Sequence, residues 1–149
     1  MSKIRLRGDD GRYLALIARQ LFSVIFIIAS AGHFTPGTIA LAAQHGVPMA
    51  NLLVPISGLI ALTGGLSVLF GYRARIGGAL LVLFLVPVTV TMHNFWAAAD
   101  AATFRLELLL FVRNIVLLCC ALLVARVGAG PLSLDAAMEP RALKADSAA

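Results

Sequence analysis

Charged residues are scarce in this sequence. They make up 13% of its 149 residues, whereas a soluble domain carries about 25%. Acidic residues are rarer than basic ones, with 7 Asp and Glu against 12 Lys and Arg. Hydrophobic residues make up 60% of the chain. So few charges cannot cover the surface of a soluble domain of this length. The composition therefore indicates an integral membrane protein.

Several motifs that carry chemistry are also missing. The two cysteines, Cys119 and Cys120, are adjacent, so on a helix they form neither a natural disulfide nor a CxxC redox pair. We expect them to be small apolar filler. The glycine pairs at 64–65 and 77–78 lack the context of a phosphate-binding loop. No serine or threonine has a visible histidine and acid partner for nucleophilic catalysis, so the sequence assigns no catalytic residue.

Long apolar runs are what the sequence has instead. Each has about 20 residues, enough to cross a hydrocarbon layer about 30 Å thick. They cover residues 14–34, 51–70, 76–92 and 104–125. We therefore predict an all-α fold, an integral membrane four-helix bundle with three parts: a basic N-terminal segment at 1–13, a four-span domain at 14–127 and a C-terminal tail at 128–149.

Basic residues are spread unevenly around these runs. Most precede the first run, occupy the turn between the second and third, or follow the fourth, and the other two connections hold only Arg105. Because basic loops stay in the cytoplasm, we expect both termini to be cytoplasmic. Arg19 lies inside the first run, and we expect it to snorkel to the headgroups. The basic residues cluster at helix ends and form no groove-lining patch, so the lipid bilayer is the expected partner and nucleic acid is not.

Small residues interrupt the second and third runs, where they predict close helix packing. Such residues let helix backbones approach where lipid supplies no hydrophobic drive. They include Gly58, Gly64, Gly65, Gly77 and Gly78. A compact bundle accounts for all of them without a ligand.

Polar residues inside or beside the runs are the candidate site. Arg113 and Asn114 stand near the middle of the last run, where an arginine costs about 2.5–3.5 kcal/mol on insertion scales. We expect both to face the bundle interior. Further polar residues gather at the ends of the runs on the side opposite the termini. Together the candidate ligand-binding residues are His33, His93, Asn94, Glu107, Arg113 and Asn114.

Three interpretations of this polar cluster remain open. In the first, Arg105, Glu107 and Arg113 form a structural ion pair that fixes the helix register. In the second, the cluster lines a pocket for a small amphiphile such as a quinone headgroup, which needs an apolar slot and a proton-exchanging His or Glu. In the third, His33, His93 and Glu107 bind a metal ion, but nothing in their spacing requires this, and we assign no metal.

Six short blocks, spread in order over most of the chain, identify a family resemblance. They are His45-Gly46-Val47-Pro48, Gly64-Gly65-Leu66, Leu69-Phe70-Gly71-Tyr72-Arg73-Ala74-Arg75, His93-Asn94-Phe95-Trp96, Phe111-Val112-Arg113-Asn114-Ile115 and Gly130-Pro131-Leu132-Ser133-Leu134-Asp135. In this ordered set the sequence resembles the DoxX family of small four-helix bacterial membrane proteins. One departure is Ala61, at a position where relatives often carry a glutamate.

The resemblance implies a place in the bacterial inner (cytoplasmic) membrane as a multi-pass protein. The family takes its name from a subunit of a thiosulfate:quinone oxidoreductase, and other relatives are linked to redox-stress complexes. It therefore implies an accessory membrane subunit of a quinone-linked redox or oxidative-stress system, with quinone as cofactor and a redox protein as partner. A small lipophile-binding or transport module and a ligand-free membrane scaffold are the alternatives, and oligomeric state stays open.

Overall fold

The computed structural model describes residues 8–139, and these residues form helices and no strand. The elements are α1 (Gly8–Gly32), α2 (Pro36–Gln44), α3 (Ala50–Phe70), α4 (Ala74–Met92), the 3-10 helix η1 (Phe95–Ala97), α5 (Ala101–Val127) and α6 (Leu134–Met138). The predicted all-α class is confirmed. Most of the basic segment 1–13 and the end of the tail, residues 140–149, lie outside the described residues.

Four of the described helices are long and apolar enough to cross a membrane: α1 from Gly11, α3, α4 with its extension to Ala97, and α5. Each begins or ends within a few residues of a predicted span. The segment between the first two spans contains α2, whose N-cap Thr35 accepts a hydrogen bond from the N–H of Thr38. Many large apolar side chains on the long helices are exposed, so the protein contacts the lipid bilayer.

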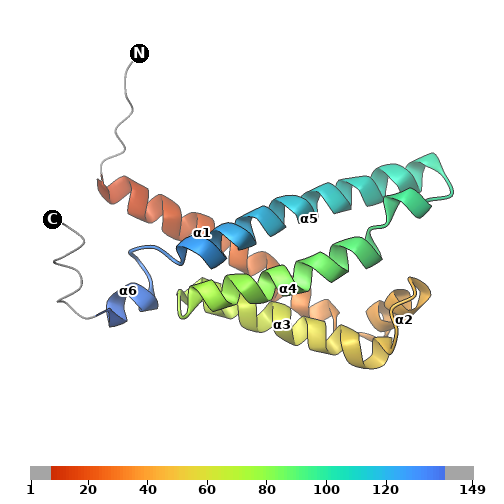
Figure 1. Ribbon diagram of the computed structural model, residues 1–149, viewed down its shortest axis with the longest axis horizontal. Coiled ribbons are helices and arrows are strands. Elements are labelled where there is room, and N and C mark those ends of the chain that lie inside the picture. Colours follow the sequence, from red (N-terminus) through yellow and green to blue (C-terminus); the bar gives the residue numbers. More distant parts are fainter. Residues whose placement is uncertain (1–7, 140–149) are drawn as a thin grey trace, which may run out of the picture.

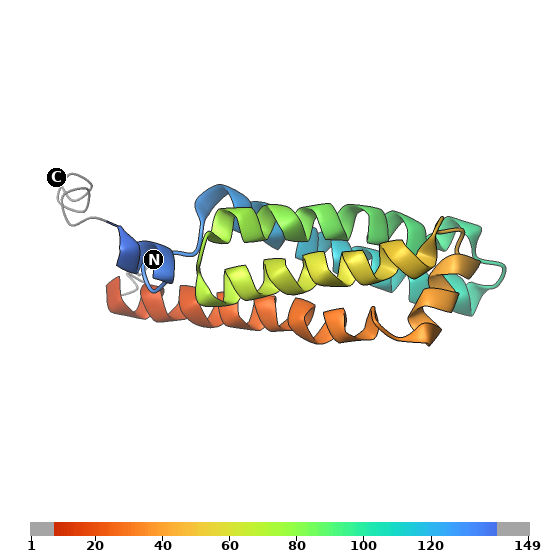
Figure 2. The same ribbon diagram turned by 90° about the horizontal axis from the view of Figure 1, so that it is seen from below.

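The main helix contacts follow a simple order. α1 packs on α3, α3 on α4 and α4 on α5, while α2 covers part of α3 and η1 covers part of α5. The start of α1 and the short α6 lie at one end of the bundle, and α2 and η1 lie at the other, as Figures 1 and 2 show. We call these the α6 end and the η1 end.

All four long helices contribute to one hydrophobic core. Its largest fully buried side chains are Phe26 from α1, Val68 from α3, and Leu81 and Leu85 from α4. Ala121 of α5 is fully buried in the same cluster. Because each helix also has an exposed apolar face, the core occupies only the inner side of each span.

Glycines set the closest helix approaches, as the sequence predicts. A Cβ on Gly78 would lie 2.6 Å from the main-chain N of Ala125, so α4 and α5 touch through their backbones. A Cβ on Gly64 would lie 3.0 Å from the main-chain O of Gly77, which brings α3 equally close to α4. The interpretation of these residues as packing positions is confirmed.

Candidate functional site

One half-buried polar pair joins α4 to α5 at the η1 end. His93, the C-cap of α4, and Glu107, in the second turn of α5, are linked by a contact of 3.0 Å between Nδ1 and Oε2. Their side chains are 15% and 20% exposed. An ionised carboxylate only accepts, so Nδ1–H of His93 donates and Nε2 remains for another partner. This pair can exchange a proton with a ligand.

Four aromatic rings from η1 and α5 form a cluster at the same end of the bundle. Phe95 lies at their centre, with its ring centroid 5.2 Å from that of Phe111, 5.1 Å from Trp96 and 5.8 Å from Phe104, each in an edge-to-face arrangement. Phe111 lies one helical turn from Glu107 on α5, so the aromatic cluster and the polar pair share one end of the bundle. An apolar wall beside a proton-exchanging group suits a flat, lipophilic ring.

Asn114 and Arg113 lie about 10 Å deeper along α5 than Glu107, at 1.5 Å per residue. Asn114 is buried, with 4% of its surface exposed, which confirms that it faces the interior. Arg113 does not: its side chain is exposed, so the prediction of an interior position is wrong for this residue. Its guanidinium donates from Nε and Nη2 to Oδ1 of Asn114, at 3.3 and 3.1 Å.

His33 belongs to this deeper level. Its ring packs edge-to-face on Phe84 of α4, with centroids 5.4 Å apart, and its Cβ lies against Gly58 of α3. Phe84 precedes His93 by nine positions on α4, or about 13 Å along the axis. The side chain of His33 therefore does not join the His93–Glu107 pair, although the sequence places both histidines at helix ends on the same side.

The predicted ion pair of Arg105, Glu107 and Arg113 is not formed in the described chain. Glu107 is paired with His93, Arg113 is hydrogen-bonded to Asn114, and Arg105 is exposed on the first turns of α5. The sequence places these three charges on one helix, but Glu107 turns toward α4. Asn94 follows His93 and is the N-cap of η1, where its carbonyl accepts from the N–H of Ala97.

Metal binding finds no support at these positions. Within residues 8–139, no three His, Cys, Asp or Glu side chains are grouped so that they could hold a metal ion. The combination of His33, His93 and Glu107 is separated into the two levels described above. Cys119 and Cys120 lie on the exposed side of α5, so they are not interior filler.

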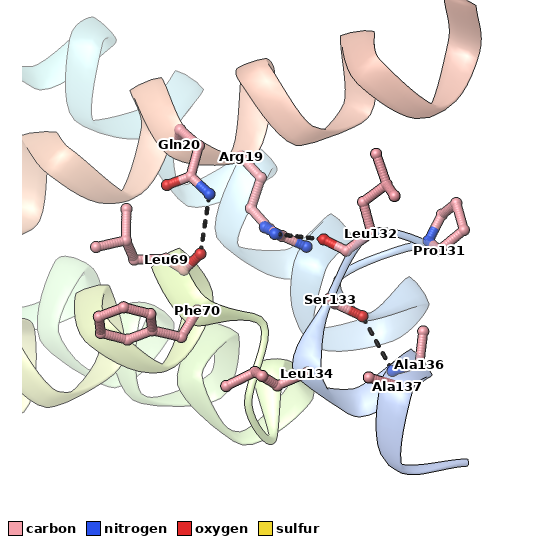
Figure 3. A pocket seen from close by; sticks show the side chains of 10 residues that line it. All are labelled: Arg19, Gln20, Leu69, Phe70, Pro131, Leu132, Ser133, Leu134, Ala136 and Ala137. Atoms are coloured by element: carbon pink, nitrogen blue, oxygen red, sulfur yellow. Dashed lines mark hydrogen bonds between the residues drawn. The ribbon is translucent and has the colours of Figure 1, made fainter. Parts of the chain in front are cut away.

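The α6 end holds a second polar cluster that sequence reasoning missed. Arg19 of α1 is 7% exposed, and its guanidinium donates to the carbonyl of Ala129 at 2.5 Å. It also donates to the carbonyl of Leu132 at 2.8 Å (Figure 3). The expectation that Arg19 snorkels to headgroups is therefore wrong. Its partners lie more than a hundred residues away in sequence, in the folded-back part of the tail, and no local pattern reveals them.

Two open hollows flank this folded-back segment, far from the His93–Glu107 pair. One has a volume of about 560 Å³ and is lined by Arg19, Gln20 and residues of α3 and the tail. Its polar groups are used internally, because Gln20 donates to the carbonyl of Leu69 and Ser133 accepts from the N–H of Ala136 (Figure 3). These hollows are the seams where the tail packs on the bundle, and we do not assign the functional site to them.

Comparison with known proteins agrees with this architecture. A family model described as DoxX matches residues 14–94. The inner membrane protein YqjF of Escherichia coli (strain K12) is 30% identical over 122 residues, which make up 80% of this chain and 88% of that protein. The chain belongs to the DoxX family. No solved structure matches it.

Membership in the DoxX family fits the membrane assignment. Four apolar helices and the likeness to an inner membrane protein identify a multi-pass protein of the bacterial inner membrane. The matched residues 14–94 include most of α1, all of α3 and α4, and His93, whereas Glu107 and Arg113 of α5 lie beyond them. Neither the family's description nor the relative's name states an activity, so the chemistry of this protein follows from its own site.

Proposed function

We propose that this protein is an accessory membrane subunit of a quinone-linked redox or oxidative-stress system, with both termini in the cytoplasm. Its contribution is to bind a quinone ring at the η1 end. The observation that carries this proposal is the 3.0 Å contact between His93 Nδ1 and Glu107 Oε2 beside the aromatic cluster of Phe95, Trp96, Phe104 and Phe111.

The residues present fit the chemistry of a quinone. The ring needs an apolar wall and a hydrogen-bond donor for a carbonyl oxygen, and its reduction takes up protons as well as electrons. Phe95 and Phe111 supply the wall. With Nδ1–H of His93 bound to Glu107, Nε2 donates to a quinone carbonyl when the ring is protonated and accepts from the quinol hydroxyl when it is neutral. The electrons have to come from a partner redox protein, since the described chain holds no thiol pair placed to supply them.

Trp96 is the only tryptophan in the sequence and makes the test direct. Its ring centroid lies 6.1 Å from that of Phe111, inside the proposed site. A decyl-substituted benzoquinone, titrated into vesicles containing the protein, should quench Trp96 fluorescence saturably. His93→Ala and Glu107→Gln should each weaken the apparent Kd about tenfold, equivalent to about 1.4 kcal/mol.

Asp100→Ala is the matched control, because Asp100 caps α5 near the site but does not touch the His93–Glu107 pair. It should lower stability and leave the quinone Kd unchanged. If the quinone binds saturably but His93→Ala and Glu107→Gln bind it equally well, the lipophile-binding or transport module is the better explanation. If no titration saturates while both variants unfold at lower temperature, the pair is structural and the protein is a scaffold.

A further inference from the structure

Arg113 stands out because it is exposed in the middle of a membrane-spanning helix. Its neighbours on α5 at three, four and seven positions away are apolar. Leu106, Leu109, Val116 and Cys120 are exposed, and Leu110 and Leu117 are half-buried. Within the described chain, its guanidinium has hydrogen bonds only to Asn114 Oδ1. A full positive charge therefore lies on an otherwise apolar helix face.

Depth makes this charge costly. At 1.5 Å per residue, Arg113 lies about 18 Å from Ala101 and about 21 Å from Val127, the two ends of α5. That places it near the centre of a hydrocarbon layer about 30 Å thick, too far from either headgroup region for the side chain to reach. Acyl chains against this face would leave a guanidinium in lipid at about 2.5–3.5 kcal/mol or more.

The protein itself does not neutralise this charge. Among residues 8–139 the membrane-embedded carboxylate is Glu107, which is paired with His93. Asp100 lies before α5 and caps it, and Asp135 lies beyond the end of α5. A second copy inserted in the same sense would bring its Glu107 to a level about 9 Å away along the axis, and that carboxylate is also paired.

The face around Arg113 is long as well as apolar. In the most apolar stretch of α5, 11% of residues are buried, against 33% in α3 and in α4. The exposed side chains continue past Arg113 in both directions, from Leu106 to Leu123. Contact along several helical turns is what a neighbouring membrane helix makes, whereas a small anion would cover only the guanidinium.

We propose that Arg113 is the docking point for a membrane-spanning helix of a partner protein that carries a carboxylate at mid-membrane depth. The exposed arginine and that carboxylate form a bidentate pair, which removes the cost of each charge in lipid. Asn114 holds the guanidinium in place through Oδ1 before the partner arrives. This inference rests on the accessory-subunit part of the proposed function and names the feature by which the subunit recognises its partner.

A defined peptide tests the proposal without the natural partner. The protein, labelled at its N-terminus with a donor fluorophore, is reconstituted in phosphatidylcholine vesicles with acceptor-labelled leucine-rich spanning peptides. One peptide has aspartate at its centre, and the matched peptide has asparagine. Energy transfer should show that the aspartate peptide associates about tenfold more tightly, the equivalent of about 1.4 kcal/mol. Arg113→Leu should abolish this preference, and Arg113→Lys should keep part of it.

Arg105→Leu is the control, because it removes an exposed arginine from the same helix near its end. The preference should survive it. Equal association of the two peptides, or a preference that persists in Arg113→Leu, overturns the proposal. So does rapid reaction of Arg113→Cys with a membrane-impermeant maleimide in a Cys119→Ala, Cys120→Ala background, since it would place Arg113 in water. If Arg113→Leu fails to fold, Arg113→Gln replaces it. No quinone is present, so this experiment and the Trp96 titration can fail independently.

Discussion

The carboxylate of Asp135 accepts a hydrogen bond from the main-chain N–H of Arg73, with Oδ1 and N 2.7 Å apart. Its other oxygen accepts from the N–H of Ala74 at 3.0 Å, and its own N–H donates to the carbonyl of Gly71. A residue of the tail thus caps the N-terminus of α4, where Arg73 has a left-handed backbone with φ of 48° and no cap of its own. The tail is therefore part of the fold.

Removal of this cap should destabilise the bundle. We expect Asp135→Ala to lower the free energy of unfolding by about 1–2 kcal/mol, because two N–H groups at the start of α4 lose their acceptor. Asp135→Asn should lose less, since one oxygen remains. Unfolding in mild detergent, followed by circular dichroism, measures both. Glu139→Ala is the control, as Glu139 is an exposed acid at the end of α6. An equal loss in Glu139→Ala would show that the capping bonds contribute nothing.

Arg19 holds the same segment from the other side. Arg19→Ala would leave the carbonyls of Ala129 and Leu132 without their donor, and we expect a loss of about 2–3 kcal/mol. Arg19→Lys should lose less, because one of the two bonds can be kept. Hydrogen exchange at residues 130–138 reports the release of the tail directly. Unchanged protection of these amides in Arg19→Ala would mean that the guanidinium does not hold the tail.

Gly71 explains why this tail can pack so closely. Its φ is +64°, and a Cβ there would lie 2.5 Å from Cβ of Ser133 and 3.0 Å from Nη1 of Arg19. The turn that ends α3 therefore has to carry a glycine both for its backbone and for the approach of the tail.

Close helix contact at Gly78 gives a third prediction. Gly78→Ala places a methyl group 2.6 Å from the main-chain N of Ala125, and α4 and α5 have to move apart. We expect a loss of about 1–3 kcal/mol in unfolding free energy. Gly37→Ala is the matched control because nothing lies within 4 Å of its Cβ position. If both variants unfolded at the temperature of the unaltered protein, α4 and α5 would not be in close backbone contact at Gly78.

Acid should weaken the start of α5. The hydroxyl of Thr103 and the N–H groups of Thr103 and Ala102 donate to Asp100. These bonds, the Thr103 hydroxyl first, lower the pKa of Asp100 below its ordinary value. Because the folded pKa is the lower one, this stabilisation is present above the unfolded pKa of about 3.9 and is lost as the pH falls through the folded value.

Asp100→Asn separates this effect from the other carboxylates, since asparagine keeps a cap oxygen but does not ionise. Between about pH 5 and pH 2 the unaltered protein should lose more of its unfolding temperature than Asp100→Asn does. Parallel pH profiles for the two proteins would contradict the assignment. High salt should reduce the difference because Asp100 is exposed.

The fold was predictable from the sequence because hydropathy and length alone decide that a run of 20 apolar residues spans a membrane. The His93–Glu107 contact followed a similar logic: both residues flank one short connection, so they share a depth. His33 broke that logic. It follows α1 directly, yet α2 and the start of α3 occupy the level nearer the η1 end, and the ring packs deeper, on Phe84. The depth of a side chain in the bundle therefore cannot be inferred from the end of an apolar run where another helix covers that end.

The α6-end cluster was not predictable for a different reason. The blocks 69–75 and 130–135 were visible as separate motifs, but a single sequence shows no pairing between segments about 60 residues apart. Asp135 and Arg73 meet only because α4 and α5 return the chain to its starting end. Arg19 likewise lies among apolar residues in the sequence, which suggested that it snorkels. Its acceptors are main-chain carbonyls, and because every residue has one, the sequence does not show which of them Arg19 binds. Hydrogen bonds from a side chain to the main chain of a residue far away in the sequence leave no pattern in the sequence.

Membrane orientation is the last prediction. The asymmetry of lysine and arginine predicts that the α6 end lies in the cytoplasm and the η1 end lies outside. Single cysteines at Gln44, in the last turn of α2, and at Tyr72, in the turn before α4, sample the two ends, and both positions are exposed. Ala74, in the first turn of α4, is not used as a labelling site because it is fully buried.

In a Cys119→Ala, Cys120→Ala background, an impermeant maleimide added to intact spheroplasts should label Gln44→Cys. Tyr72→Cys should react only after lysis, because it lies beside the basic turn of Arg73 and Arg75. If the reverse pattern is observed, the His93–Glu107 pair faces the cytoplasm and its proton exchange is with that side. Labelling of both positions from outside would mean that α3, the one span between them, does not cross the membrane, and the bundle topology itself would have to be revised.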